Sequence, residues 1–397
     1  MREHSSRTME YLFFDRSEQK HYRKYSWYGY TENQNIELVL VVLIVTDNNN
    51  SELDDLVTSF FQLYEQKMVK VSDIKKQYSK KEDTSLDNIL KLLETQDRIY
   101  IERYPRIVDD KLRQDIDIDD IVFFGTFPSI LRKTLLYKTK VEYGNYTINH
   151  ILGCAHGCNY PCYAMQMSKR WGRIKNYDDW MHPRIVSNAL DLIDTEIPKM
   201  NSDIQFVHLS FMSDPFMYDA VNKRNISPIQ DLTMRIIRRL NQESIKVTVL
   251  TKGLLPKDLE NDELNNQNEY GITLVSLNDQ FYEKFEPFSA PPRERIDELE
   301  KRHDAGLSTW VSLEPYPTPN LVKQDINDIL SEVSFVDKLI FGKWNYFAEV
   351  NGYSGKDAHY QQCADNVIDF CKTNKIPLHI KHGTPRSNKE TEGLFEN

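Results

Sequence analysis

The sequence predicts an α/β fold: a partial or full (β/α) barrel of the TIM type with an additional N-terminal lobe of mixed α+β structure. From about residue 140 onward, short apolar strand-like segments alternate with amphipathic helical segments, which is the pattern of a parallel sheet. The first third of the chain lacks this alternation. The length of 397 residues suits two or three domains, or one large barrel with an extra lobe.

The N-terminal lobe is assigned to residues 1–135. Its role stays open between a lid, a partner-docking surface and a substrate-recognition domain. Alternating acidic residues at Asp115, Asp117 and Asp119 lack the glycine and the downstream glutamate of a calcium loop, so a solvated strand edge is the better interpretation. The patterns predict strands at residues 11–14, 25–30 and 37–45 and helices at 53–67 and 85–93.

The barrel is assigned to residues 136–397. In barrels of this kind the carboxyl ends of the strands carry the chemistry, and the unusual residues of this chain gather at those ends. The predicted strands are residues 146–152, 204–211, 245–251, 271–277, 309–314, 338–342 and 377–381, and the predicted helices between them are 185–197, 230–241, 293–305 and 324–333.

Composition limits the function classes. Fifty basic and sixty acidic side chains give a net charge of −10, which disfavours a protein that mainly grips nucleic-acid phosphates. The obvious lysine cluster, residues 75–81, falls in the N-terminal lobe. The longest apolar run, residues 38–45, is too short for a membrane span or a signal peptide, so we expect a cytoplasmic protein without a membrane partner.

Three of the five cysteines, Cys154, Cys158 and Cys162, fall within nine residues after the first predicted barrel strand. Thiolates are the ligands of iron–sulfur clusters, and three of them leave one iron of a four-iron cluster open. Structural zinc needs four ligands, and only His156 is close by, so zinc and plain packing are the weaker interpretations. Cys363 and Cys371 fall on a predicted helix and are expected to pack in the core.

The cysteine segment and four further motifs resemble the radical SAM superfamily, in its spore photoproduct lyase-related branch. The run GCAHGC at residues 153–158 resembles the Gly-Cys-x-His-x-Cys opening of that branch. The other matches, in order along the predicted strand ends, are MSDP at 212–215, LTK at 250–252, VSLN at 275–278, and FEP at 285–287 followed by RER at 293–295.

The resemblance implies the cofactors and their site. Cys154, Cys158 and Cys162 would hold a 4Fe-4S cluster, S-adenosylmethionine would bind its open iron, and an external one-electron donor of the flavodoxin or ferredoxin type would reduce it. Reductive cleavage would then yield a 5′-deoxyadenosyl radical. The implied contacts to S-adenosylmethionine are Tyr163 near the adenine, Ser213 at the amino group, Asp214 ordering its turn, Lys252 at the carboxylate, and Ser276 at the carboxylate or ribose.

Each of these contacts also has an ordinary structural interpretation. Asp214 before a proline is a common turn residue, Lys252 before a glycine is a common strand exit, and Ser276 suits a solvated strand end. The agreement of residue type and strand position with the cysteine motif favours the functional interpretation.

The chain departs from the family pattern at two places. The second cysteine gap, Asn159-Tyr160-Pro161, is one residue longer than the family spacing. Phe211 stands where spore photoproduct lyase has a hydrogen-donating cysteine, which disfavours DNA repair by that route.

The substrate is expected to be a small molecule, a nucleotide or a peptide. Glu314, Lys343 and Asn345, at the ends of two predicted strands, are the candidates for substrate contact and catalysis, with a rim salt bridge as the alternative interpretation. Trp344 is suited to stack on a base or ring. Two other functions stay open: a lyase for a nucleic-acid lesion, and a non-catalytic barrel that acts as an interaction module.

Overall fold

The structure is a computed structural model of the chain. This structure describes residues 127–199, 204–261 and 263–387, together with the backbone of several strands that precede them. The chain divides into two compact units, Met1–Pro128 and Ser129–Asn397. None of the helices in the described part of the chain has the length and apolar character needed to cross a membrane.

The first unit contains short antiparallel sheets. Strands β1 (Arg7–Asp15), β2 (Lys20–Tyr30) and β3 (Ile36–Thr46) pair in chain order and cover the three predicted strands of the lobe. The predicted helices at 53–67 and 85–93, the lysine cluster at 75–81 and Asp115–119 lie outside the described residues. The remaining strands are β4 (Met68–Lys70), β5 (Ile99–Glu102) and β8 (Ile121–Phe124) in one sheet, and β6 (Ile107–Val108) with β7 (Lys111–Leu112) in another.

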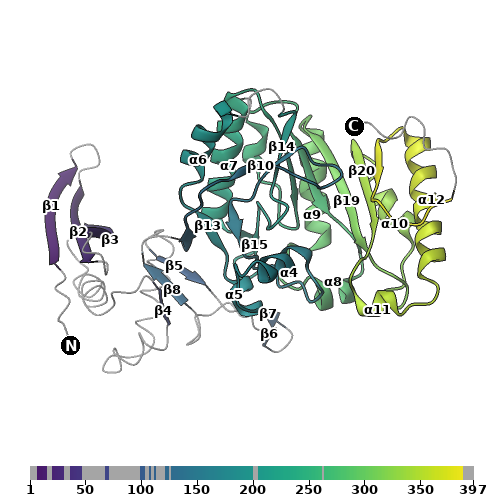
Figure 1. The fold of residues 1–397 in the computed structure, drawn as a ribbon, viewed down its shortest axis with the longest axis horizontal. Helices are drawn as coiled ribbons and strands as arrows, with labels where there is room; N and C mark the ends of the chain where they lie inside the picture. Colours follow the sequence, from purple (N-terminus) through teal and green to yellow (C-terminus); the bar gives the residue numbers. More distant parts are fainter. Residues whose placement is uncertain are drawn as a thin grey trace. The chain divides into compact units, whose positions relative to one another are not determined.

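The second unit is built on an eight-stranded sheet (Figure 1). Its first two strands are antiparallel and every later neighbour is parallel, which confirms the predicted α/β class and large parallel sheet. The sheet order ends at β10 and β21, so among the described strands the sheet is open. In that order the strands are β10 (Leu136–Lys138), β11 (Tyr146–Ile148), β14 (Phe206–Leu209), β17 (Lys246–Thr251), β18 (Glu269–Thr273), β19 (Ser308–Tyr316), β20 (Lys338–Lys343) and β21 (Leu378–Ile380).

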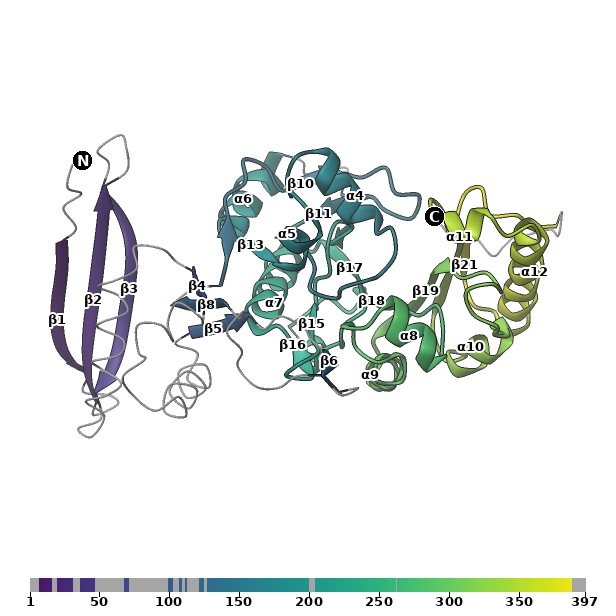
Figure 2. The ribbon, with the colours of Figure 1, turned by 90° about the horizontal axis from the view of Figure 1, so that it is seen from below.

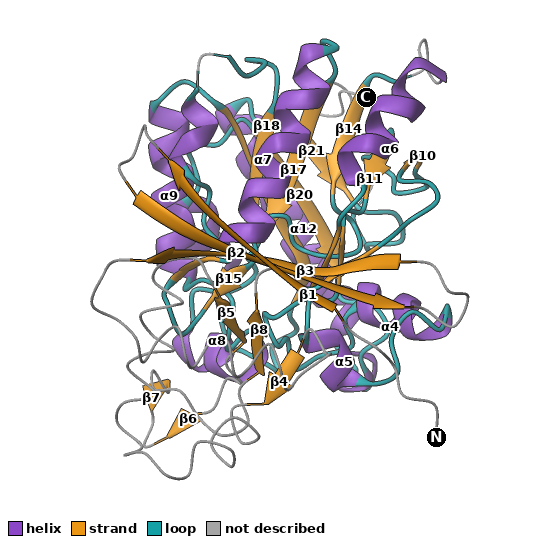
Figure 3. Ribbon diagram, turned by 90° about the vertical axis from the view of Figure 1, so that its left-hand side faces the viewer, coloured by secondary structure: helices purple, strands orange, loops and turns teal. Residues whose placement is uncertain are grey.

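Helices connect most of the parallel strands and pack along them, as Figure 3 shows for α7 beside β17. In α7 (Ser227–Gln242) the buried residues Ile229, Leu232, Ile236 and Leu240 recur every three or four positions, which places one apolar stripe against the sheet. Proline in the first turn of this helix is compatible with helical geometry. The other connecting helices are α6 (Ala189–Glu196), α8 (Asp279–Phe285), α9 (Pro292–Asp304), α10 (Ile326–Glu332) and α12 (Lys356–Asn374).

The predicted strand at residues 146–152 is divided in two. β11 ends at Ile148, and β12 (Ile151–Leu152) joins a separate three-stranded sheet with β13 (Arg184–Val186) and β9 (Ser129–Ile130). Polar residues at the break account for the division: the Asn149 side chain accepts hydrogen bonds from Ser210 Oγ (3.0 Å) and Met212 N (2.9 Å). The chain that enters the cysteine segment therefore leaves the main sheet and runs on the smaller one. β9, which the sequence-based boundary placed in the N-terminal lobe, belongs to the second unit.

Candidate functional site

A cavity of about 540 Å³ opens at the carboxyl ends of the parallel strands. The three clustered cysteines lie at its wall together with residues from six strand ends, as expected for a barrel site. The polar residues that these strand ends contribute include Ser210, Ser213 and Asp214 after β14, Lys252 after β17, Thr273 on β18, Ser312 and Glu314 on β19, Lys343 and Asn345 at the end of β20, and Lys381 and His382 after β21.

Backbone contacts fix the path of the cysteine loop. The Cys154 N–H donates to the Trp180 carbonyl at 2.8 Å, and Phe288 N–H donates to the His156 carbonyl at 3.3 Å. Gly157 has a φ of +59°, and a Cβ there would lie 2.3 Å from the Phe288 ring, so this position requires glycine. Cys162 is the N-cap residue of α4 (Tyr163–Arg170), so the loop ends where a helix begins.

The three cysteines are half-buried and line the cavity. Burial raises the pKa of Cys158 to about 11, although the nearby Lys252 cation opposes this, and burial also raises the pKa of Cys154. Both groups are therefore protonated near neutral pH unless a metal displaces the proton, as ligating thiols require.

The extra residue of the second cysteine gap is accommodated by an inward-facing tyrosine. Tyr160 packs its ring edge against Trp344, with centroids 5.0 Å apart, and its hydroxyl contacts Lys252 Nζ. Beside it, Asn159 is tied to α8, since its backbone N–H donates to the Phe285 carbonyl and its side chain to the Lys284 carbonyl, each at 3.0 Å. The longer gap is thus anchored at two consecutive residues.

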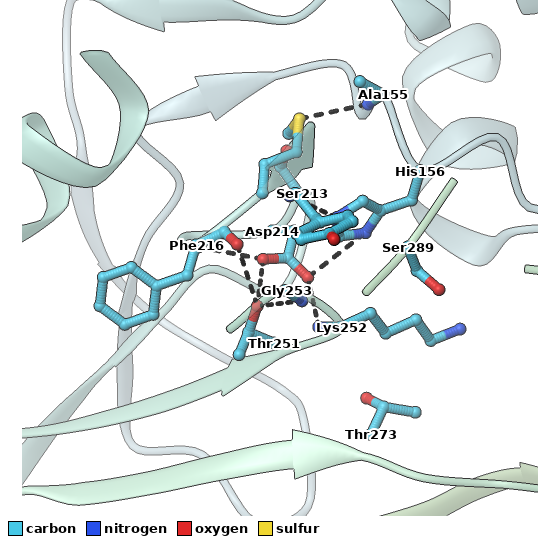
Figure 4. Close-up of polar contacts among 12 residues, drawn as sticks. Ala155, His156, Ser213, Asp214, Phe216, Thr251, Lys252, Gly253, Thr273 and Ser289 are labelled. Carbon is cyan, nitrogen blue, oxygen red and sulfur yellow. Dashed lines mark hydrogen bonds and ion pairs between the residues drawn. The ribbon is translucent and has the colours of Figure 1, made fainter. Parts of the chain in front are cut away.

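Asp214 connects three segments of the site (Figure 4). Its carboxylate accepts hydrogen bonds from Thr251 Oγ1 at 2.6 Å and from the Lys252 backbone N–H at 2.7 Å. His156 Nδ1 lies 3.6 Å from the same carboxylate, and His156 Nε2 accepts from the Tyr218 N–H at 2.8 Å. Burial lowers the pKa of His156 to about 4, so its ring is neutral with the proton on Nδ1, facing Asp214.

Ser213 joins the loop from the other side, because its hydroxyl contacts the Gly153 carbonyl and its side chain lines the cavity. Tyr163, the first residue of α4, also lines the cavity and is 59% exposed, so much of its side chain is open to solvent.

A buried ion triad lies behind the cysteine loop. Glu286 bonds to Lys252 Nζ at 2.7 Å and to Arg295 at 2.8 Å, and Arg295 also donates to the Thr273 carbonyl at 2.6 Å. Lys252 Nζ lies 4.0 Å from Cys158 Sγ. Burial alone would raise the pKa of Glu286, but the two cations outweigh it and lower that pKa to about 2. The sequence motifs contained all three residues, yet only the fold shows that they form one group.

Ser276 is not part of this cavity. Its hydroxyl donates to Gln324 at 2.6 Å and accepts from the Asn278 N–H at 3.1 Å, at the start of α8. The reason is that β18 ends at Thr273, whereas the prediction extended the strand to residue 277. Thr273 and Ser312 are the strand-end hydroxyls that do line the cavity at this level, and the sequence analysis did not select them.

Glu314, Lys343 and Asn345 all line the cavity. Glu314 forms an ion pair with Lys381 at 3.6 Å, and Lys381 lies 4.0 Å from Glu142. Burial raises the pKa of Glu314, Lys381 opposes this, and Glu142 adds to it. The salt bridge expected as the alternative interpretation of Glu314 is therefore present, and it lies in the cavity wall.

Aromatic side chains cover another part of the wall. Phe211, where the resemblance implied a hydrogen-donating cysteine, stacks on His208 with centroids 3.8 Å apart and meets Tyr143 edge-on at 5.7 Å. Tyr143 and Glu142, on the turn before β11, were missed by the sequence analysis because nothing in their local pattern marks them. Trp344 lines the cavity but is only 3% exposed, since Tyr160 and Phe347 pack against it.

No protein-family model matches the chain. An uncharacterised protein of Methanocaldococcus jannaschii is 26% identical over 233 residues, covering 58% of this chain and 80% of that protein. A second uncharacterised protein, from Acidianus two-tailed virus, is 24% identical over 233 residues, covering 53% of this chain and 72% of its own length.

Solved structures with a similar chain path were also found. Spore photoproduct lyase with bound AdoMet and dinucleoside spore photoproduct is 15% identical with a TM-score of 0.47, covering 63% of this chain and 80% of that chain. The radical S-adenosylmethionine methyltransferase TsrM of Kitasatospora setae is 11% identical with a TM-score of 0.34, covering 60% of this chain and 45% of that chain. Both likenesses are similarities of chain path at low sequence identity.

Proposed function

We propose that this protein is a radical SAM enzyme. It holds a 4Fe-4S cluster on Cys154, Cys158 and Cys162, binds S-adenosylmethionine at the open iron, and uses the resulting radical on a substrate in the same cavity. The observation that carries the proposal is the position of these three thiols, on one loop, at the end of a strand-end cavity lined by Ser213 and Lys252.

The residues present suit such a cluster. Three soft thiol ligands from one loop open into a cavity, and the other two described cysteines, Cys363 and Cys371, are buried in the core on α12. Within the described ranges, no three His, Cys, Asp or Glu side chains converge as the ligands of a single metal ion would, and this includes the three clustered cysteines. Asn159, Tyr160 and Ser213 give the loop fixed attachments on both sides.

The cluster, when bound, supplies one electron that cleaves the sulfonium of S-adenosylmethionine to methionine and a 5′-deoxyadenosyl radical. The protein's own residues bind S-adenosylmethionine and orient it. Lys252, Glu286 and Arg295 together carry one net positive charge, so Lys252 retains an attraction for a carboxylate even though Glu286 is bound to it. Ser213 offers a hydroxyl to the amino group, and Tyr163 offers a ring face to the adenine.

Asp214 acts by positioning, since it holds Lys252 and the His156 segment of the loop in place. Thr273 and Ser312 take the place that the resemblance gave to Ser276, because their hydroxyls line the cavity.

The substrate side lies at Glu314, Lys343, Asn345 and Lys381. This wall offers both signs of charge, and Tyr346, 77% exposed, lies at its edge. A small polar molecule, a nucleotide or a peptide fits such a wall better than a uniformly anionic polymer does.

Iron and sulfide analysis after anaerobic reconstitution tests the cluster. We expect about four irons and four sulfides per chain in the wild type and a large loss in Cys158→Ala. Cys363→Ala is the matched control, because Cys363 is buried on α12 and its removal should leave the iron content unchanged. Zinc in the wild type, or equal iron in Cys158→Ala, would contradict the proposal.

Chromatography of a dithionite reaction with S-adenosylmethionine tests the activity. Slow formation of methionine and 5′-deoxyadenosine is expected even without substrate. A complete cluster with no cleavage above background would favour the non-catalytic interaction module.

A further inference from the structure

The segment that covers the cysteine loop has two different sides. We call residues 163–181, which include α4 and α5 (Tyr177–Met181), the α4–α5 segment; Figure 2 shows the two helices next to each other. Its inner side is apolar: Ala164, Ile174 and Trp180 are buried in a cluster with Leu152 and Met212. Cys154 and Cys162 pack against the same cluster, so the inner side lies directly on the cysteine loop.

The outer side of the α4–α5 segment is cationic. Lys169, Arg170, Arg173 and Lys175 are all exposed, in a chain whose net charge is −10. The acidic residues of the segment, Asp178 and Asp179, offset this only in part, since Asp179 is paired with Arg184 at 2.7 Å. Arg132 is a further cation near the segment. Burial lowers the pKa of Arg132, and the positive charge of the nearby Arg173 lowers it further.

Exposed aromatic rings lie among these cations. Trp171 is 49% exposed and has the Arg173 guanidinium 4.6 Å from its ring centroid. Tyr177, on α5, is 43% exposed. Both rings therefore lie on the exposed part of the α4–α5 segment, among its cations.

The layer between the cysteine loop and this surface is thin. Cys162 caps α4, and eight residues of helix at 1.5 Å per residue put the basic end about 12 Å from that cysteine. Glu314 and Lys343, the candidates for substrate contact, belong instead to β19 and β20.

We propose that the cationic outer side of the α4–α5 segment is the docking surface for an acidic one-electron donor protein of the flavodoxin or ferredoxin type. This inference rests on the proposed function, because the electron acceptor is the cluster on the cysteine loop. In the step, the reduced flavin or iron–sulfur centre of the donor loses one electron and the cluster gains it; no bond forms or breaks and no proton is required.

Two features favour a redox partner over a nucleic acid at this surface. The segment that carries the cations packs directly on Cys154 and Cys162, which is where an electron must enter. Redox complexes are commonly small and weak, and complementary charge steers their encounter, which suits a compact patch of four cations. Basic and aromatic residues together also bind single-stranded nucleic acid, so that class is an outcome of the test.

The test uses a variant in which Lys169, Arg170, Arg173 and Lys175 are all replaced by Gln. The matched control replaces the exposed residues Lys199, Arg235, Lys257 and Lys323 by Gln, which removes the same charge outside the segment. Far-UV circular dichroism and thermal unfolding verify that both variants fold. The probes are a purified bacterial flavodoxin, dithionite, and a 20-nucleotide single-stranded DNA.

Two measurements are made on each protein. Calorimetric titration of flavodoxin into the cluster-free protein, at about 0.05 and 0.3 M salt, measures docking alone. Stopped-flow absorbance of the reconstituted protein then measures cluster reduction by flavodoxin and by dithionite.

We expect the patch variant to lose at least about tenfold in flavodoxin affinity and reduction rate at low salt, with dithionite reduction unchanged. The control variant should match the wild type, and the wild-type rate should fall as salt rises. Equal flavodoxin binding and reduction in the patch variant would overturn the inference. The inference would also be overturned if the patch variant lost DNA binding while flavodoxin still reduced its cluster at the wild-type rate. If no cluster forms, the proposed function fails, and the calorimetric titration still decides whether the surface binds the donor.

Discussion

Removing the charge of Glu286 is expected to destabilise the second unit by about 3 kcal/mol. Glu286 lies between Lys252 and Arg295, and the side chains of Glu286 and Arg295 are 3% and 1% exposed. In Glu286→Gln the shape is kept, but two cations then face each other with no carboxylate between them. Breaking a buried pair by removing one partner typically costs about 3–5 kcal/mol, because the remaining charge is left uncompensated.

The pKa of Glu286 leads to the same magnitude for the loss of stability. Its fall from the ordinary value of 4.5 to about 2 is worth about 3 kcal/mol, since one pKa unit corresponds to about 1.4 kcal/mol. Because the folded-state pKa is the lower one, this stabilisation is fully present above pH 4.5 and is lost as the pH falls toward 2. The wild type and Glu286→Gln should therefore differ most near neutral pH and converge in acid.

Urea unfolding followed by tryptophan fluorescence measures the difference in free energy of unfolding at pH 7 and at pH 3.5. Glu332→Gln is the matched control, because Glu332 forms an ion pair of similar length with Arg293 on the surface, with side chains 41% and 58% exposed. Exposed pairs contribute about 1 kcal/mol or less. A loss below about 1 kcal/mol in Glu286→Gln, or equal losses in both variants, would refute the reasoning.

Three further predictions concern packing, pH and the cysteine loop. A Cβ added in Gly271→Ala would lie 2.4 Å from the buried Trp310 ring, so we expect a loss of about 1–3 kcal/mol by thermal unfolding. Burial lowers the pKa of His150 to about 3, so stability falls as the pH drops from 6.5; His150→Gln should lessen that slope by up to about 1.4 kcal/mol per pH unit in urea titrations. Tyr160→Ala, which removes the ring packed on Trp344, should cost about 2 kcal/mol and lower the iron retained through gel filtration; unchanged retention would contradict the anchoring role.

The parallel sheet and the cavity position could be predicted because they depend on local patterns. Short apolar segments such as the strand ending at Thr251 carry their own signal, and the carboxyl ends of parallel strands meet at one edge. The ends of strands were harder to predict from the sequence, as Ser276 shows. β18 stops at Thr273, where the chain turns toward α8, and that turn depends on tertiary packing.

Contacts between distant segments could not be predicted. Glu286, Arg295 and Lys252 each belong to a recognisable motif, but their grouping into one ion triad needs α8, α9 and the end of β17 in place. The basic run at residues 169–175 was equally visible in the sequence. Its position over the cysteine loop follows only from the packing of Ile174 and Trp180 beneath it.

The small sheet of β9, β13 and β12 couples the start of the second unit to the cysteine loop. Ser129, the first residue of the second unit, begins β9; β9 pairs with β13, β13 pairs with β12, and β12 leads into Cys154 after a single glycine. A force applied to the chain at Pro128 is therefore transmitted to the cysteine loop through two hydrogen-bonded ladders, without a flexible spacer to absorb it. Shortening or stiffening the chain just before Ser129 would act on the same loop that holds the thiols.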